Sequence, residues 1–161
     1  MSGPRSIGVL GLARSGRAAA LLALAAGNRV FASDAGASPA LRAAADAVRA
    51  AGGEAETGGH DVDRLAACDL VVVSPGIPPS APVLRELSAR GVRCISELEF
   101  AFTHLRAPVV AVTGTNGKST VTALTAHLLQ AAGLKAVAAG NIGLALSEVA
   151  RGEEQPDWVV V

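Results

Sequence analysis

The chain has 161 residues, of which 50% are hydrophobic and 17% charged, with 14 basic residues against 14 acidic ones. This balance argues against nucleic acid as a partner, because such proteins carry a basic face and stacking aromatics, whereas only 2% of these residues are aromatic. No apolar run reaches the roughly 18 residues that a membrane span needs, and no signal-peptide core follows the first residues. We therefore expect a cytoplasmic protein with neither nucleic acid nor membrane as a partner.

Short β-branched runs alternate with alanine- and leucine-rich stretches along the chain. This alternation is typical of βαβ units, and it predicts an α/β fold built on a parallel sheet. The predicted strands cover residues 7–10, 29–32, 70–73 and 92–95, with a weaker candidate at 54–56. The predicted helices cover residues 15–26, 39–51 and 81–90, and residues 97–106 form a connecting helix. Cys68 and Cys94 adjoin predicted strands, where we expect free, buried thiols.

The first predicted strand runs into a glycine-rich turn, Gly-Leu-Ala-Arg-Ser-Gly at residues 11–16, and Asp34 ends the second strand. Such a turn aims backbone N–H groups and a helix dipole at a phosphate, and the acid suits a ribose hydroxyl. Ala13 stands where dinucleotide-binding turns normally have glycine, so a nucleotide other than NAD fits better. A tight turn without a ligand and an NAD(P)-linked oxidoreductase remain as alternatives.

The strand predicted at 70–73 ends in the turn Ser-Pro-Gly-Ile-Pro at residues 74–78. Open α/β sheets bind their ligands at the carboxyl ends of parallel strands, so we expect the amides of this turn to line the same crevice. Proline and glycine are also ordinary turn residues, and a purely structural turn is the alternative interpretation.

A second βα series opens at Ala107 and Pro108, which predicts a domain boundary between residues 107 and 108. An apolar run at 108–112 leads into Val-Thr-Gly-Thr-Asn-Gly-Lys-Ser-Thr at 112–120, and a helical stretch follows at 121–132. The general phosphate-loop pattern would put its first glycine at residue 112, so the glycine at 114 makes this loop a variant. The loop predicts ATP or GTP binding.

Each polar group of this loop suits a phosphate. The backbone N–H groups and the helix N-terminus converge on phosphate oxygens, and Lys118 would bridge the terminal phosphates. The Ser119 hydroxyl would face a magnesium ion as a partial metal site, with Thr120 beside it. The expected ATP-binding residues are Gly114, Thr115, Asn116, Gly117, Lys118, Ser119 and Thr120.

An apolar run at 136–139, the sequence Gly-Asn-Ile-Gly at 140–143, a short helix and a strand at 158–161 complete the chain. In phosphate-loop enzymes an acid that helps to hold magnesium commonly follows such a strand. The chain stops at this strand, before such an acid. We therefore expect residues 108–161 to be the start of an ATP-binding domain, and we expect the chain by itself to bind its ligands without catalysing a reaction.

Together these segments resemble the Mur ligase family over essentially all 161 residues. The segments that carry the resemblance are the glycine turn, Ser-Asp at 33–34, Val-Val-Val-Ser-Pro-Gly-Ile-Pro, Glu-Leu-Glu-Phe, the phosphate loop and Gly-Asn-Ile-Gly. The loop variant marks the whole family, whereas Ser-Pro-Gly-Ile-Pro and Gly-Asn-Ile-Gly favour its D-glutamate-adding branch over the alanine-adding one. Ala13 departs from the usual glycine.

The resemblance implies an ATP- and Mg²⁺-dependent, three-domain ligase of peptidoglycan synthesis, monomeric as the full enzyme, that joins D-glutamate to UDP-N-acetylmuramoyl-L-alanine through an acyl phosphate. It implies a Rossmann-like UDP-sugar domain at residues 1–107 and an incomplete ATP domain at 108–161. By the same resemblance Lys118 and Asn141 are the catalytic residues. The implied UDP-sugar contacts are Arg14, Ser15, Asp34, Ser74, Pro75 and Gly76. A non-catalytic nucleotide-binding module is the other alternative.

Overall fold

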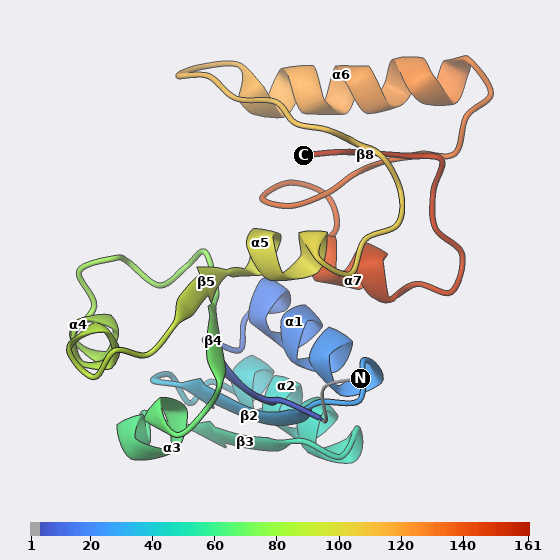
Figure 1. Cartoon of the computed structure of the whole chain (residues 1–161). Helices are drawn as coiled ribbons and strands as arrows, with labels where there is room; N and C mark the ends of the chain where they lie inside the picture. The colour runs from blue at the N-terminus through green and yellow to red at the C-terminus, as the bar shows by residue number, and fades with distance from the viewer. Residues whose placement is uncertain (1–3) are drawn as a thin grey trace.

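Two parallel sheets organise residues 4–161, which are the residues that the computed structural model describes (Figure 1). The five-stranded sheet has the order β3-β2-β1-β4-β5, and the three-stranded sheet has the order β6-β8-β7. The strands are β1 Ser6–Leu10, β2 Arg29–Asp34, β3 Glu54–Thr57, β4 Leu70–Val73, β5 Cys94–Ser96, β6 Val109–Val110, β7 Ala136–Ala138 and β8 Trp158–Val160. All their pairings are parallel, which confirms the predicted α/β class.

Helices connect these strands. They are α1 Arg14–Ala25, α2 Pro39–Ala50, α3 Val62–Ala66, α4 Pro82–Ala89, α5 Glu97–Phe102, α6 Lys118–Ala131 and α7 Leu146–Arg151. In Figure 1, α6 lies along the outer side of the three-stranded sheet, while α7 lies on its inner side, next to α5 and α1. The phosphate-loop unit therefore meets the first sheet unit through α7.

A shared glycine motif ends four of the helices and fixes where the next segment begins. At the end of α4, Gly91 has φ +73°. The Gly91 amide donates to the Ser88 carbonyl and the Val92 amide donates to the Leu87 carbonyl, each at a distance of 3.0 Å. A left-handed glycine followed by an apolar residue is the usual helix stop of this kind. The equivalent glycines of α1, α2 and α6 are Gly27, Gly52 and Gly133.

Alternate side chains of the five-stranded sheet enter two apolar clusters, one on each face. Ile7 and Val9 of β1 join the cluster beneath α1 and α2. Leu10 of β1 joins the opposite cluster, with Leu65 of α3 and Leu87 of α4. Helices on both faces bury the sheet, as expected for parallel strands joined by crossover helices.

The cluster on the α1 side continues into the three-stranded unit. It includes Phe100 of α5, Leu146 and Val149 of α7 and Val159 of β8, all of them buried. One apolar core thus spans the position between residues 107 and 108 where the sequence predicts a domain boundary.

Several predicted bounds are wrong, for local reasons. The strand expected at 92–95 starts only at Cys94 because Val92 is held by the end of α4. The strand expected at 108–112 is limited to two residues, the helix expected at 97–106 ends at Phe102, and α6 begins at Lys118 rather than at 121. Helix α3, which Asp61 caps through the Arg64 amide at 3.0 Å, was not predicted because it is too short to show periodicity. Cys94 is exposed, contrary to the expectation.

Within residues 4–161, no helix has the length and apolar character needed to cross a bilayer.

Ser147 provides a test of the packing between the units. Its side chain is fully buried in α7, and its hydroxyl has no hydrogen-bond partner within residues 4–161. Because an unpaired buried hydroxyl is unfavourable, we expect Ser147→Ala to leave the free energy of unfolding unchanged or to raise it by about 1 kcal/mol in urea denaturation.

Ser38→Ala is the matched control. The Ser38 hydroxyl accepts from the Leu41 amide at 3.3 Å and caps α2, so its loss should lower the free energy of unfolding by about 1 kcal/mol. A loss at Ser147 as large as at Ser38 would contradict the assignment of an unsatisfied hydroxyl.

Candidate functional site

Two loops meet closely at the carboxyl edge of the five-stranded sheet, because one of them has glycine at the contact. Gly11 has φ +91°, and a Cβ at this position would lie 2.9 Å from Cβ of Ser74. The Ser74 amide also donates to the Leu10 carbonyl at 2.9 Å. The glycine turn after β1 and the Ser-Pro-Gly turn after β4 are therefore brought together, as the sequence predicts.

The amino end of α1 in the glycine turn is open to a ligand. Its N-cap residue is Ala13, and within residues 4–161 the helix has no side-chain cap hydrogen bond. The first amides of a helix need an outside acceptor, and the helix dipole favours an anion there. Arg14 is exposed at this end and Ser15 is half-buried, so both are accessible to a ligand.

Asp34, at the end of β2, stabilises the loops at the same carboxyl edge of the five-stranded sheet. Its Oδ2 accepts from the Leu12 amide at 2.7 Å, and its Oδ1 accepts from the Gly36 amide at 2.8 Å. The carboxylate thus holds the glycine turn against the loop after β2. A carboxylate has about four acceptor sites, so two remain for a ligand hydroxyl.

A polar network next to Asp34 was not predicted. The buried Ser33 hydroxyl lies 2.7 Å from Nδ1 of His60 and 2.9 Å from Oε1 of Glu56. The same Glu56 oxygen accepts from the Asp61 amide at 2.6 Å, so the network fixes the loop after β3 at the sheet edge. Ser33 is more than 20 residues from Glu56 and His60 along the chain, and no short motif signals these contacts.

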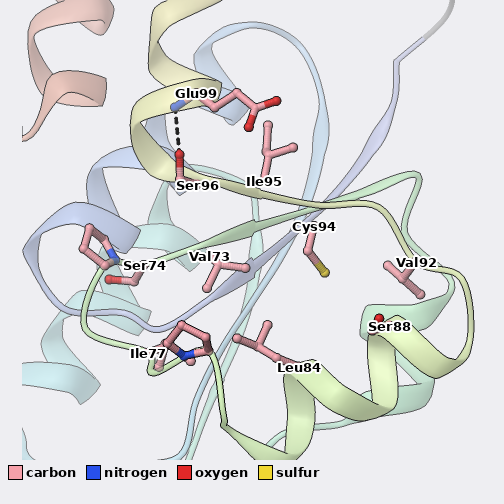
Figure 2. A pocket seen from close by; sticks show the side chains of 12 residues that line it. Val73, Ser74, Ile77, Leu84, Ser88, Val92, Cys94, Ile95, Ser96 and Glu99 are labelled. Carbon is pink, nitrogen blue, oxygen red and sulfur yellow. Dashed lines mark hydrogen bonds between the residues drawn. The ribbon is translucent and has the colours of Figure 1, made fainter. Parts of the chain in front are cut away.

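A cavity of about 570 Å³ lies beyond this edge, between the turn after β4, helix α4 and strand β5 (Figure 2). Val73, Ile77 and Leu84 form its apolar part, and Cys94 faces it from β5. Although Cys94 is exposed as a residue, partial desolvation of its sulfur raises the pKa of the thiol, which keeps the thiol protonated at neutral pH.

Only part of the expected UDP-sugar set belongs to this cavity. Ser74 and Pro75 line it, whereas Arg14, Ser15, Asp34 and Gly76 do not. Arg14 and Ser15 stand at the start of α1, and Asp34 contacts the Leu12 amide. Gly76 is exposed.

The phosphate loop forms the second candidate site, at the amino end of α6. Gly117 is the N-cap residue with φ +76°, and no side chain caps the helix, so its first amides are available to an anion. Lys118 Nζ donates to the Gly114 carbonyl at 2.5 Å and lies 3.5 Å from the Thr115 carbonyl. Lys118 therefore lies against carbonyls of its own loop, at the amino end of α6.

A cavity of about 240 Å³ adjoins the loop and brings Lys118 and Ser119 together with Asn141. Thr122 and Leu98 also line it, and neither was predicted. Thr122 is only 3% exposed and lines the cavity, so its hydroxyl is placed where it could contact a ligand. A lining threonine one turn into α6 could have been found from helix periodicity, but Leu98 comes from the other unit.

A closed loop carries Asn141 to this cavity. The Gly140 amide donates to the Leu144 carbonyl at 2.7 Å. Gly143 has φ +66°, and a Cβ there would lie 2.3 Å from the Ala138 carbonyl oxygen, so only glycine fits. The loop is thus shaped by its own backbone, with the exposed Asn141 near its tip.

A Rossmann-like parallel unit with an open glycine turn, packed against a phosphate-loop unit, defines the fold class of this α/β protein and contains both candidate sites. Residues 5–96 match the model of the N-terminal domain of MurD-like Mur ligases. The chain belongs to the Mur ligase family, which confirms the resemblance seen in the sequence.

Curated relatives agree with this assignment. The UDP-N-acetylmuramoylalanine–D-glutamate ligase of Desulfatibacillum aliphaticivorans is 40% identical over 97% of this chain and 35% of its own length. The ligase of the same name from Salinibacter ruber is 43% identical over 95% of this chain and 34% of its own length. The chain thus spans about a third of these relatives.

A solved structure shows the same fold. A murein peptide ligase from Psychrobacter arcticus superposes with a TM-score of 0.59 at 28% identity, covering 97% of this chain and 37% of its own.

The glycine turn after β1 can be tested by a single methyl group. A Cβ at Gly16 would lie 1.7 Å from the Gly11 carbonyl oxygen, so Gly16→Ala must displace the turn. We expect the free energy of unfolding to fall by about 1–3 kcal/mol in chemical denaturation.

Gly76→Ala is the matched control. Its φ is not in the left-handed region and a Cβ there meets nothing within 4 Å, so the change should stay within about 0.5 kcal/mol. Equal effects of the two substitutions would contradict the close approach at Gly16.

Proposed function

We propose that the protein to which this chain belongs is an ATP-dependent ligase that joins D-glutamate to UDP-N-acetylmuramoyl-L-alanine in peptidoglycan synthesis. The proposal is carried by the combination of two units in one chain. The MurD-like first domain has the open amino end of α1 and Asp34 at one edge of its sheet. The next unit has a phosphate loop that shares a cavity with Asn141. The names of the relatives that the chain matches support the choice of substrates. Because the reaction consumes ATP and a nucleotide sugar, we place it in the cytoplasm.

In the proposed reaction the γ-phosphate of ATP passes to the carboxylate of the substrate's alanine. The amine of D-glutamate then attacks the acyl phosphate, forms the amide bond and releases inorganic phosphate. Phosphoryl transfer depends on positioning and charge stabilisation more than on covalent help from the protein. Lys118 and the free amides at the start of α6 supply both, and Lys118 would exchange the Gly114 carbonyl for a phosphate oxygen.

The Ser119 hydroxyl suits Mg²⁺, which prefers oxygen ligands and keeps several waters beside nucleotide phosphates. Ser119 would thus help to hold an ion whose positive charge would offset the negative charge of the ATP phosphates. Asn141 lies across the same cavity, where its amide can orient the substrate's carboxyl group toward the γ-phosphate.

The uridine diphosphate group is proposed to lie at the edge of the five-stranded sheet. The open amides of α1, together with Arg14 and Ser15, would hold the pyrophosphate. Asp34 would accept a hydrogen bond from a hydroxyl or a ring N–H of the uridine. The turn at Ser74, Pro75 and Gly76 would cover the nucleoside.

The first site can be tested by calorimetric titration of the chain with UDP-N-acetylmuramoyl-L-alanine, with NADH as the competing ligand class. We expect selective binding of the UDP-sugar. Asp34→Ala should weaken it about tenfold or more, because a hydrogen bond to a charged group contributes roughly 1.5–3 kcal/mol.

Asp34→Asn separates binding from folding at this position. The amide oxygen can still accept from one of the two backbone amides, so we expect it to lose less stability than Asp34→Ala in a parallel urea titration. Selective NADH binding would overturn the proposal, as would undiminished UDP-sugar affinity in a folded Asp34→Ala protein.

The second site can be tested with ATP and Mg²⁺. Lys118→Ala should weaken ATP binding at least about tenfold, because it removes a charge-assisted contact to phosphate. Lys135→Ala is the matched control, since that exposed lysine faces only Glu154 at 3.7 Å and lies outside the cavity. The proposal fails if both variants bind ATP as the unmodified chain does.

A further inference from the structure

Two side chains of the first sheet unit fasten the segment that carries Asn141. Arg14 Nη1 donates to the Gly143 carbonyl at 2.7 Å. Glu97 Oε1 accepts from the Ser147 amide at 2.7 Å, in a buried contact between residues 50 positions apart. The segment from Gly140 to Ser147 is therefore held from outside at two points.

Glu97 acts on α7 as a capping side chain would. Helix α7 has six residues, begins after Ala145 and has no side-chain cap of its own. The first amides of a helix need acceptors, and a carboxylate at that end is also favoured by the helix dipole. Glu97 supplies that acceptor from the first residue of α5.

Burial of the Glu97 carboxylate is energetically unfavourable unless hydrogen bonds satisfy it. Its side chain is 1% exposed, and no arginine or lysine pairs with it within residues 4–161. A buried carboxylate is tolerated when hydrogen bonds satisfy it, and removing its partner is more unfavourable than replacing both.

The residue after Glu97 links this contact to the nucleotide cavity. Leu98 lines the cavity together with Lys118 and Asn141. A Cβ at Gly140 would lie 3.3 Å from Leu98 Cδ2, so α5 abuts the loop. A movement of α7 away from Glu97 would therefore carry the Asn141 loop away from Leu98.

We propose that Glu97 is a positioning residue of the nucleotide site. It fixes the amino end of α7 and, with Arg14, sets the Gly140–Gly143 loop so that Asn141 faces Lys118 across the cavity. The inference rests on the proposed ATP site, and it adds a role for a buried acid of the first unit that touches no ligand.

The experiment compares Glu97→Leu, which keeps the side-chain bulk but cannot accept a hydrogen bond, with Glu97→Gln, whose amide oxygen can. Amide hydrogen exchange at residues 140–147 is measured in the ligand-free protein, and ATP and UDP-sugar affinities are measured by calorimetry. Glu99→Leu is the matched control, because Glu99 lies two residues further on in the same helix and is exposed.

For Glu97→Leu we expect exchange at Ser147 to rise about tenfold and ATP affinity to fall about tenfold, with UDP-sugar affinity changed less than about twofold. Glu97→Gln should restore most of the slow exchange and most of the ATP affinity, and Glu99→Leu should change neither. If Glu97→Leu does not fold, Arg14→Ala tests the other attachment at an exposed site and should also raise exchange in the loop and weaken ATP binding.

Unchanged exchange at Ser147 in Glu97→Leu would overturn the inference, and so would unchanged ATP affinity despite faster exchange. Failure of the unmodified, folded chain to bind ATP would instead count against the nucleotide site. The exchange data would then still decide whether Glu97 holds the segment.

Discussion

The packing of α7 against α1 and α5 is the contact on which the arrangement of both sites depends. It joins the two sheets into one apolar core, in which Leu146 and Val149 lie with Phe100. It also sets the distance between the open end of α1 and the loop that carries Asn141. Interfaces between units of one chain are often modest and mobile, but a shared buried core with a buried acid in it favours one relative placement.

The proposed anion sites do not depend on net positive charge. The 14 basic and 14 acidic residues cancel, and the attraction for phosphate would come instead from the helix ends without side-chain caps at α1 and α6. Local dipoles act over a short range and would direct phosphates to these two helix ends. A basic surface would attract polyanions at many places.

The sequence predicted the parts of the fold that have local causes. Alternating apolar runs predicted the order of strands and helices, and glycine-rich motifs predicted the turns after β1 and before α6. Contacts between distant segments could not be predicted. These contacts depend on how the crossover helices and the second sheet pack, and no short motif encodes this packing. Examples are the contact of Ser33 with His60, the contact of Glu97 with Ser147, and the position of Leu98 in the cavity. Short elements such as α3 were missed because five residues show no periodicity.

Two residues of the proposed sites hold their own loops by the same groups that would hold a ligand. Asp34 accepts from Leu12 and Gly36, and Lys118 donates to Gly114. The consequences for the proposed function differ, because a carboxylate can accept further bonds, while the ammonium would give up a carbonyl to reach a phosphate. Asp34 is therefore preorganised, and the proposed binding there would leave the turn in place. At Lys118 the proposed binding would include an exchange of partners, so the affinity for ATP would be the difference between two charge-assisted bonds and not the full strength of one.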